Sequence, residues 1–228
     1  MHAATILLFD IDGTLVSTAG AGRRAMVGAF REVTGRDPCD FPFDGMTDRA
    51  IAREGLRRAG REPDSSAVDD LLERYVGHLE REAAGGVGFR VFAGIREAIH
   101  LAESLDRVAL GLGTGNVKRG AVMKLAPVGL YSHFLFGGFG CDHEERAELI
   151  AIGARRGAER LGVALEACRV VVVGDTPRDV AAARAVGADC LAVATGRHSV
   201  DELIGSGATF AFPDLSAPGA LRALLGER

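Results

Sequence analysis

Six short apolar runs, each of strand length, recur along the chain and constrain its fold more than any other feature. They are TILLF (5–9), RVALGL (107–112), HFLF (133–136), RVVVV (169–173), CLAVA (190–194) and TFAF (209–212). Near-continuous apolar runs are typical of strands that are buried on both faces of a parallel sheet. Most of these runs alternate with segments whose apolar residues have helical spacing. The pattern predicts an α/β fold built on a doubly wound parallel sheet.

The segment between residues 17 and 88 carries no strand pattern and is expected to be helical. Residues 64–84 place their apolar side chains on one helical face, and TDRAIAREGLRRAG (47–60) starts with Thr-Asp and stops at Gly. We therefore expect a helical domain over 17–88, inserted into an α/β core made of 1–16 and 89–228. The glycine-containing stretches at its two ends can act as hinges or be ordinary loops.

Composition excludes several classes of protein. The chain has 228 residues, enough for a full core, with 47% hydrophobic and 25% charged residues. A net charge of −4 offers no electrostatic footprint for nucleic acid or an anionic membrane, and no apolar run approaches the roughly 20 residues of a membrane span. The four cysteines form no CxxC pair, and the N-terminal apolar run lacks the flanks of a signal peptide. We expect a cytoplasmic protein, either a monomer or a homodimer.

Two aspartates separated by one residue follow the first apolar run. In extended backbone, Asp10 and Asp12 point to the same side, at the carboxyl edge where open α/β sheets bind their ligands. Carboxylates so close together repel, so they need a cation, a shared proton or both. Gly13 permits a tight reversal, and Thr14 offers a hydroxyl near the turn. An acidic turn without a catalytic role is the alternative interpretation.

A second acidic motif, GDTPRD (174–179), follows the RVVVV run. Asp175 comes at the end of the expected strand, Thr176 is a plausible N-cap of the next helix, and Asp179 falls in its first turn. Helix capping alone explains Asp179, whereas Asp175 precedes the cap and lies at the strand mouth. Together with Asp10, Asp175 can supply oxygen ligands for Mg²⁺.

The third motif, GTGN (113–116), follows the RVALGL run. Thr114 ends the expected strand, Gly115 lets the backbone approach a ligand, and Asn116 is a plausible cap of the next helix. Backbone N–H groups at such a helix start attract phosphate oxygens. An ordinary capped helix would show the same pattern. The motif gains weight because three strand ends of one sheet then carry groups suited to phosphate or metal.

In combination and in this order, DIDGT, GTGN and GDTPRD resemble the haloacid dehalogenase superfamily of phosphohydrolases, and specifically its phosphoglycolate-phosphatase-like members. The resemblance covers essentially the whole chain, and the helical insert resembles the family's α-helical cap on a Rossmann-like core. It implies that Asp10 is a nucleophile that forms an aspartyl-phosphate, and that Asp12 protonates the leaving group and then activates water. Thr114 would hold the phosphoryl oxygens. Mg²⁺ would be bound by Asp10, the backbone carbonyl of Asp12 and Asp175, with Asp179 assisting.

Residues around these motifs are expected to contact the substrate, which the resemblance implies is a small phosphate ester. Those nearest the phosphate are Gly13, Thr14, Gly115 and Asn116. In the helical insert, the loop DGMTDRA (44–50) offers Thr47, Asp48 and Arg49, of which Arg49 could meet a carboxylate or a second phosphate. Alternatively, Thr47 or Asp48 merely caps the following helix.

The chain departs from the family in its active-site cation. The family usually has a lysine between the second and third motifs, where this chain offers only Lys118 and Lys124, both inside the helix of the second motif. Arg146 is the candidate replacement, because a cation in the first turn of a helix opposes the helix dipole by ~0.3–1 kcal/mol and so calls for a nonlocal role. The alternative is a surface arginine paired loosely with Glu144 or Glu145. We expect Arg146 to be the cation, with Lys118 as the second candidate.

The resemblance is compatible with several functions, and the residues of this chain exclude some of them better than others. A Mg²⁺-dependent phosphatase and a phosphomutase differ in whether water or a sugar hydroxyl meets the aspartyl-phosphate, and both fit the motifs. Retention of Asp12, Asp175 and Asp179 disfavours a metal-independent dehalogenase. The phosphonate-cleaving branch needs a lysine in its cap, and no lysine precedes Lys118. A non-catalytic binding or regulatory protein on this fold predicts loss of a catalytic carboxylate, and none is lost.

Overall fold

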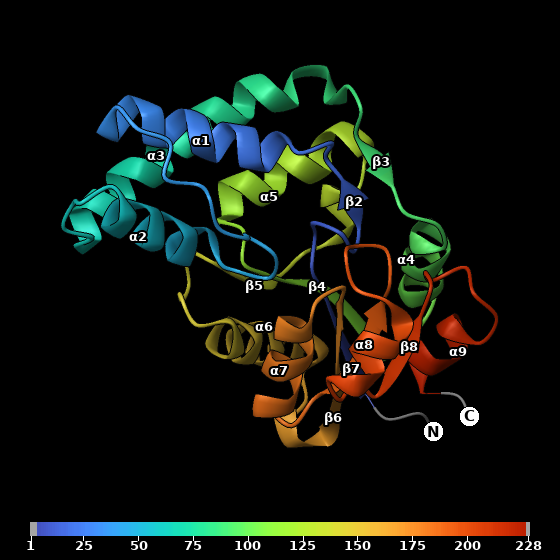
Figure 1. Ribbon diagram of the computed structural model, residues 1–228. Coiled ribbons are helices and arrows are strands. Elements are labelled where there is room, and N and C mark those ends of the chain that lie inside the picture. Colours follow the sequence, from blue (N-terminus) through green and yellow to red (C-terminus); the bar gives the residue numbers. More distant parts are fainter. Residues whose placement is uncertain (1–3, 227–228) are drawn as a thin grey trace.

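The computed structural model describes residues 4–226, and a six-stranded parallel sheet in the order β5-β4-β1-β6-β7-β8 forms their centre (Figure 1). The strands are β1 (Ala4–Phe9), β4 (Val108–Thr114), β5 (Gly137–Phe139), β6 (Cys168–Gly174), β7 (Asp189–Val193) and β8 (Phe210–Phe212). Every pairing in this sheet is parallel. In the register, Phe9 of β1 lies opposite Leu112 of β4 and Val173 of β6. The predicted doubly wound α/β fold is confirmed.

Helices cover both faces of the sheet. They are α4 (Ile95–Glu103), α5 (Lys118–Leu125), α6 (Arg146–Leu161), α7 (Pro177–Ala185), α8 (Val200–Gly205) and α9 (Ala220–Leu225), joined in part by short 3-10 turns. Alternate residues of β1 point to opposite faces: Leu7 and Phe9 pack in the cluster that includes α4 and α9, and Ile6 and Leu8 in the one that includes α6 and α7. This double burial explains why the strands are apolar without alternation.

The run HFLF (133–136) is not a strand, contrary to the prediction. The chain instead forms a 3-10 turn over Tyr131–His133, and the edge strand β5 has the sequence GGF. Helix α6 packs directly on this strand, so that a Cβ added to Gly138 would lie 1.7 Å from the carbonyl oxygen of Leu149. Because close packing selects glycine here, a search for apolar side chains does not find the strand.

The segment between the first two long strands is helical. It contains α1 (Ala21–Thr34), α2 (Asp48–Arg58) and α3 (Ser65–Ala83), which share a hydrophobic cluster of their own. The chain enters and leaves this helical segment through the short strands β2 (Val16–Ser17) and β3 (Arg90–Val91), which pair antiparallel. The helices therefore form a separate layer beyond the carboxyl edge of the sheet (Figure 1). Its status as a domain over 17–88 stays a prediction.

The start of α2 docks this helical layer onto the loops of the sheet. The backbone N–H of Asp48 donates to the carbonyl of Gly115 at 2.8 Å, and the Thr47 hydroxyl donates to the carbonyl of Glu144 at 2.9 Å. Arg53 adds an ion pair of 3.0 Å to Glu144. The loop that precedes α2 is thus held against the mouth of the sheet.

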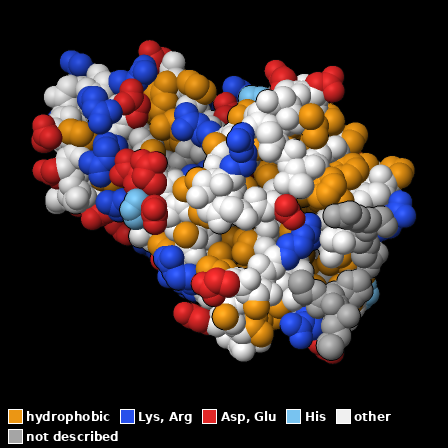
Figure 2. Space-filling model, turned by 90° about the horizontal axis from the view of Figure 1, so that it is seen from below, with side chains coloured by type: hydrophobic (Ala, Val, Ile, Leu, Met, Phe, Trp, Pro, Cys, Tyr) orange, Lys and Arg blue, Asp and Glu red, His pale blue; other side chains and the backbone are white. Residues whose placement is uncertain are grey.

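The distribution of charge on the surface and the character of the helices agree with the mixed charge and moderate hydrophobicity of the composition. On the face shown in Figure 2, acidic and basic side chains are interspersed. None of the helices within residues 4–226 combines the length and the apolar character that a transmembrane segment needs.

Candidate active site

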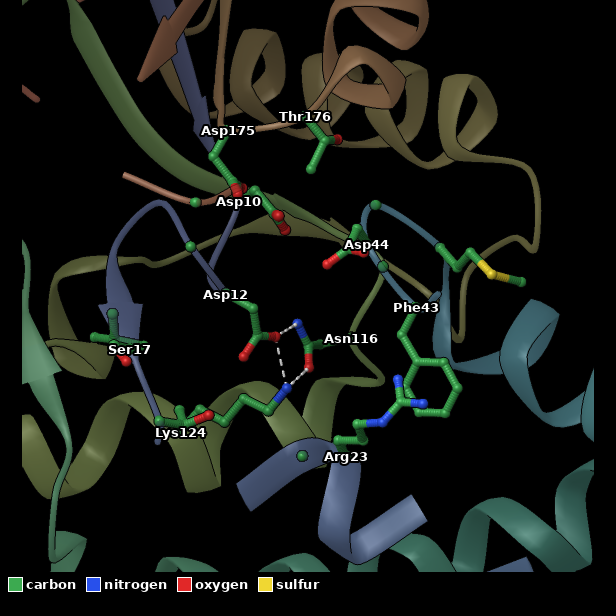
Figure 3. A pocket seen from close by; sticks show the side chains of 18 of the residues that line it. Asp10, Asp12, Ser17, Arg23, Phe43, Asp44, Asn116, Lys124, Asp175 and Thr176 are labelled. Carbon is green, nitrogen blue, oxygen red and sulfur yellow. Dashed lines mark hydrogen bonds and ion pairs between the residues drawn. The ribbon is translucent and has the colours of Figure 1, made fainter. Parts of the chain in front are cut away.

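The carboxyl edge of the sheet brings the three sequence motifs together. Asp10 follows β1, Thr114 is the last residue of β4, and Asp175 follows β6. Because β1 lies between β4 and β6, these residues meet around Asp10. Asp10 and Asp175 line a cavity of about 450 Å³ between the sheet edge and the helical layer (Figure 3). This is the position where open α/β sheets bind ligands.

Arg146, in the first turn of α6, lies between two carboxylates. Its Nη2 is 3.1 Å from Oδ1 of Asp10 and 2.5 Å from Oδ1 of Asp179. Its Nε donates a further hydrogen bond of 2.9 Å to the same oxygen of Asp179. The guanidinium is buried, so its charge acts in a medium that screens it weakly. The structure thus places Arg146, the first candidate from the sequence, beside the expected nucleophile.

One guanidinium does not neutralise this cluster. Burial raises the pKa of Asp10 to about 6, although the charge of Arg146 and a hydrogen bond from Thr114 lower it. Burial raises the pKa of Asp175 further, to about 8, and the negative charges of Asp179 and Asp10 add to the shift. A hydrogen bond from the Thr14 hydroxyl, 3.2 Å from Oδ1, opposes it. Such shifts mark a site with spare negative charge, which a further cation would relieve.

The donor set suits a hard divalent cation. Carboxylate oxygens of Asp10, Asp175 and Asp179 all lie within 4.8 Å of one another. Oxygen ligands from carboxylates are those that Mg²⁺ takes in proteins. The Asp175 carboxylate packs against Gly13, where only glycine fits, because φ is +81° and an added Cβ would lie 2.3 Å from Oδ2 of Asp175.

Asp179 uses its oxygens within the protein. Oδ1 accepts both hydrogen bonds from Arg146, and Oδ2 accepts from the backbone N–H of Thr176 at 3.1 Å and from its hydroxyl at 2.6 Å. These four bonds fill the acceptor capacity of a carboxylate. The capping interaction expected from the sequence is therefore present, and the same side chain orients Arg146.

Asp12 has a cation of its own, which the sequence analysis did not assign. Lys124 Nζ lies 2.6 Å from Oδ2 of Asp12 and donates to Oδ1 of Asn116, also at 2.6 Å (Figure 3). Lys118 instead points its Nζ over the ring of Phe139, 5.9 Å from the centroid. The missed signal is the position of Lys124, which shares the buried face of α5 with its apolar residues.

The loop before α2 lines the cavity through Asp44, Gly45 and Met46 rather than through all three of the residues that the sequence predicted. Of the three predicted substrate contacts, only Asp48 lines the cavity, and its Oδ2 accepts the backbone N–H of Val117 at 2.8 Å. Burial raises the pKa of Asp48 to about 6. Thr47 caps α2 by accepting from the N–H of Ala50, and Arg49 forms an ion pair of 2.6 Å with Asp69. The structure therefore does not bring Thr47 or Arg49 into the cavity.

The predicted phosphate contacts divide into two layers. Gly13, Gly115 and Asn116 line the cavity itself. Thr14 and Thr114 are fully buried beneath it, where they support Asp175 and Asp10.

Arg23, at the start of α1, is a cavity-lining cation that the sequence analysis missed. Its guanidinium stacks 4.4 Å from the ring centroid of Phe43 and donates to the carbonyls of Phe41 and Cys39 (Figure 3). Within residues 4–226, no carboxylate lies at ion-pair distance from it. Only the cluster GAGRRA, at the entry to the helical segment, could have drawn attention to it.

Comparison with known proteins agrees with this geometry. The family model of haloacid dehalogenase-like hydrolases matches residues 4–187. Phosphoglycolate phosphatase from Chromobacterium violaceum is 30% identical over 204 residues, which cover 85% of each chain.

Solved structures share the fold. CbbY from Rhodobacter sphaeroides, in complex with phosphate, matches with a TM-score of 0.71 at 20% identity, covering 98% of this chain and 99% of its own. A hydrolase from Pseudomonas syringae matches with a TM-score of 0.69 at 19% identity, covering 93% of this chain and 94% of its own. With the family model spanning every strand that supplies the motifs, the chain belongs to the haloacid dehalogenase-like hydrolases.

Proposed function

We propose that the protein is a Mg²⁺-dependent phosphatase that hydrolyses a small phosphate monoester through an aspartyl-phosphate on Asp10. One observation carries the proposal: Asp10 lies at a strand mouth with Arg146 at 3.1 Å, a hydrogen bond from Thr114 and the carboxylate of Asp175 nearby. A nucleophile, a cation for phosphoryl oxygens and ligands for a metal are then in one place. The name of the relative from Chromobacterium violaceum supports the same reaction class.

In the first half of the reaction, a carboxylate oxygen of Asp10 attacks phosphorus. The bond from phosphorus to Asp10 forms while the bond to the leaving oxygen breaks, and Asp12 gives that oxygen a proton. Arg146 offsets the negative charge of the nucleophile and of the phosphoryl oxygens. Gly115 and Asn116 line the cavity and are the proposed contacts of those oxygens, while Thr114 supports Asp10 from beneath.

In the second half, water attacks the phosphorylated Asp10. Asp12, now deprotonated, takes a proton from the water, the bond from phosphorus to Asp10 breaks, and inorganic phosphate leaves. Asp10 and Asp12 return to their starting states. Each carboxylate thus has one task, although they are separated by a single residue.

Bound Mg²⁺ would act as a Lewis acid on the phosphoryl oxygens and reduce repulsion within the cluster. The carboxylates of Asp10 and Asp175 and the main-chain carbonyl of Asp12 would hold it. The raised pKa values of Asp10 and Asp175 support a cation at this position. We assign Asp179 a different role from the metal ligand expected from the sequence: because its oxygens are taken up by Arg146 and Thr176, it orients the guanidinium.

We further propose that residues 17–88 act as a cap over the core formed by 1–16 and 89–228, in a cytoplasmic monomer or homodimer. The cavity lies between these two parts, so the cap would choose the leaving group. Arg23 lines the cavity from this segment, and among residues 4–226 no carboxylate lies at ion-pair distance from it. A substrate with a second anionic group, such as 2-phosphoglycolate, would satisfy it.

A screen of phosphorylated metabolites tests the proposal. We expect phosphate release from 2-phosphoglycolate or a sugar phosphate with Mg²⁺, no release in chelator, and no turnover by Asp10→Asn, which loses the nucleophile. Turnover by Asp10→Asn, or full activity in chelator, would contradict the mechanism. Transfer of the phosphoryl group to a second sugar without phosphate release would identify a mutase instead.

A further inference from the structure

Lys124 is a buried cation that the proposed reaction does not yet use. It lies on the inner face of α5 and is 3% exposed, whereas Asp12, its ion-pair partner, has a side chain that is 43% exposed. Burial lowers the pKa of Lys124, but the neighbouring groups Asp12, Tyr75 and Asp48 together raise it by more, so the net shift is upward. Keeping an ammonium charged in the interior costs desolvation energy, and an ion pair with a half-exposed carboxylate is weak evidence of a gain in stability. The position therefore calls for a role other than stability.

The contacts of Lys124 converge on one oxygen of Asp12. Oδ2 accepts from Lys124 Nζ at 2.6 Å and from Nδ2 of Asn116 at 2.9 Å, and Lys124 donates to Asn116 at 2.6 Å (Figure 3). These three groups form a closed triangle that fixes the side-chain torsions of Asp12. In the described part of the chain, no hydrogen bond or ion pair engages the other oxygen, Oδ1. One oxygen is clamped and the other is left for solvent and substrate.

Lys124 also lies close to the helical segment. Tyr75 of α3 and Asp48 of α2 interact electrostatically with its ammonium. A Cβ added to Gly22 of α1 would lie 3.1 Å from Nζ. All three helices of that segment thus close around the group that holds Asp12. The seating of these helices and the position of the Asp12 carboxylate are therefore linked through one side chain.

We infer that Lys124 is the positioning residue for the acid–base carboxylate: together with Asn116 it clamps Oδ2 of Asp12 so that Oδ1 is presented to the leaving oxygen and then to water. The inference rests on the proposed function. It divides the two cations between the two carboxylates, with Arg146 serving the nucleophile and Lys124 serving the proton carrier. Lys124 exchanges no proton itself and makes no bond to phosphorus.

The two halves of the reaction give this role a distinctive signature. p-Nitrophenolate leaves phosphorus without needing a proton, whereas an alkoxide leaving group needs one from Asp12. Loss of Lys124 should therefore spare phosphorylation of Asp10 by p-nitrophenyl phosphate and slow phosphorylation by an alkyl phosphate. It should slow hydrolysis of the aspartyl-phosphate with both esters, because water must still lose a proton to Asp12.

The test is rapid-mixing kinetics of Lys124→Met with p-nitrophenyl phosphate and with 2-phosphoglycolate, or with the alkyl phosphate that the wild-type protein hydrolyses fastest. We expect a burst of p-nitrophenolate at close to the wild-type rate, followed by a steady state at least about tenfold slower. Phosphorylation by the alkyl ester should fall by at least about tenfold. In an Asp12→Asn background, Lys124→Met should have almost no further effect, because the clamped group no longer carries the proton.

Controls separate positioning from folding. Methionine matches the length of the lysine stem, and Asp12 keeps access to solvent, so we expect Lys124→Met to fold; thermal unfolding checks this. Lys124→Arg keeps the charge and should restore part of the alkyl-ester rate. Arg119 lies on the same helix as Lys124 and forms an exposed ion pair with Glu73 of α3, so Arg119→Met should change neither rate.

Equal losses in the burst and in the alkyl-ester phosphorylation would overturn the inference, as would additive losses in the double variant. If Lys124→Met does not fold, Lys124→Arg decides by the same comparison of the two esters. Failure of the wild-type protein to hydrolyse either ester would overturn the proposed function, and the inference with it, and is distinguishable because it appears before any variant is made.

Discussion

Arg146 Nη2 lies 3.1 Å from Oδ1 of Asp10, although one residue begins helix α6 and the other follows strand β1. The first turn of a helix is an unfavourable place for a cation, because backbone N–H groups already concentrate positive charge there. Two carboxylates, Asp10 and Asp179, outweigh that cost in the buried site. The pair gives the proposed nucleophile a partner that stays charged at any working pH.

Arg146→Ala should lower kcat by tens-fold or more, equivalent to roughly 2 kcal/mol or above on the transition-state scale. The reason is that charge on the nucleophile and on the phosphoryl oxygens would lose its buried counter-charge. Steady-state kinetics with the best substrate measure the effect. Lys118→Ala is the comparison, because that lysine lies over Phe139 and is not among the residues that line the cavity. A larger loss in Lys118→Ala would reverse the assignment.

Asp179→Asn and Asp175→Asn should fail in different ways. Asp179→Asn loosens Arg146 and should lower kcat while leaving the Mg²⁺ concentration for half-maximal activity nearly unchanged. Asp175→Asn removes a proposed metal ligand and should raise that Mg²⁺ concentration by tenfold or more, as is typical of losses around metal sites. Magnesium titrations of the two variants make the comparison. An equal rise in both would return Asp179 to the metal ligands.

The metal-free protein should become less stable as pH rises from about 4 to about 8. Folding raises the pKa of Asp10 from 3.8 to about 6 and that of Asp175 from 3.8 to about 8. In this window the folded state binds more protons than the unfolded state, so the free energy of unfolding falls with rising pH. Under the proposed function, Mg²⁺ would bind the deprotonated carboxylates, and its stabilising effect should be larger at pH 8 than at pH 6.

Thermal unfolding at several pH values, in chelator and in Mg²⁺, measures this dependence. Asp175→Asn is the control, because it removes the group with the larger shift and should flatten the slope in chelator. A metal-free protein that gains stability across the same window would show that these carboxylates are ionised without a metal.

Arg23→Gln should raise KM for a substrate with a second anionic group by tenfold or more and change kcat less. Its guanidinium lines the cavity and, among the described residues, has no carboxylate at ion-pair distance. A phosphate ester without a second charge should show almost no change. Arg49→Gln is the matched control in the same helical segment, because Arg49 is paired with Asp69 away from the cavity. Equal effects on both esters would leave Arg23 with a structural role.

Sequence patterns predicted what depends on local spacing and missed what depends on packing across elements. The apolar runs located the central strands, because burial on both faces leaves the same mark on each. The sequence did not predict strand β5, because α6 approaches Gly138 too closely for a side chain and the strand therefore lacks an apolar pattern. Lys124 escaped because a lone lysine on a helix reads as surface, and only the tertiary fold shows that its face is buried against Asp12 and Asn116.

In the loop before α2, the sequence predicted substrate contacts that the structure does not place in the cavity. Thr47 and Arg49 have the chemistry of substrate contacts, and the sequence offers no way to see that one caps α2 and the other meets Asp69. A polar side chain that is paired within the protein is less available to bind a ligand, and the sequence alone does not show which side chains are paired.

The antiparallel pairing of Val16–Ser17 with Arg90–Val91 brings the two ends of the helical segment side by side. The segment is therefore an insertion whose two ends lie next to each other in space. The order and register of the six-stranded sheet do not depend on the length of this insertion. A shorter, longer or unrelated insertion could be spliced in at the same pair of strands while Asp10, Thr114 and Asp175 keep their places. If the protein works as proposed, the residues that break the bond and the residues that choose the substrate lie in different parts of the chain, and each set can change by mutation or recombination without rebuilding the other.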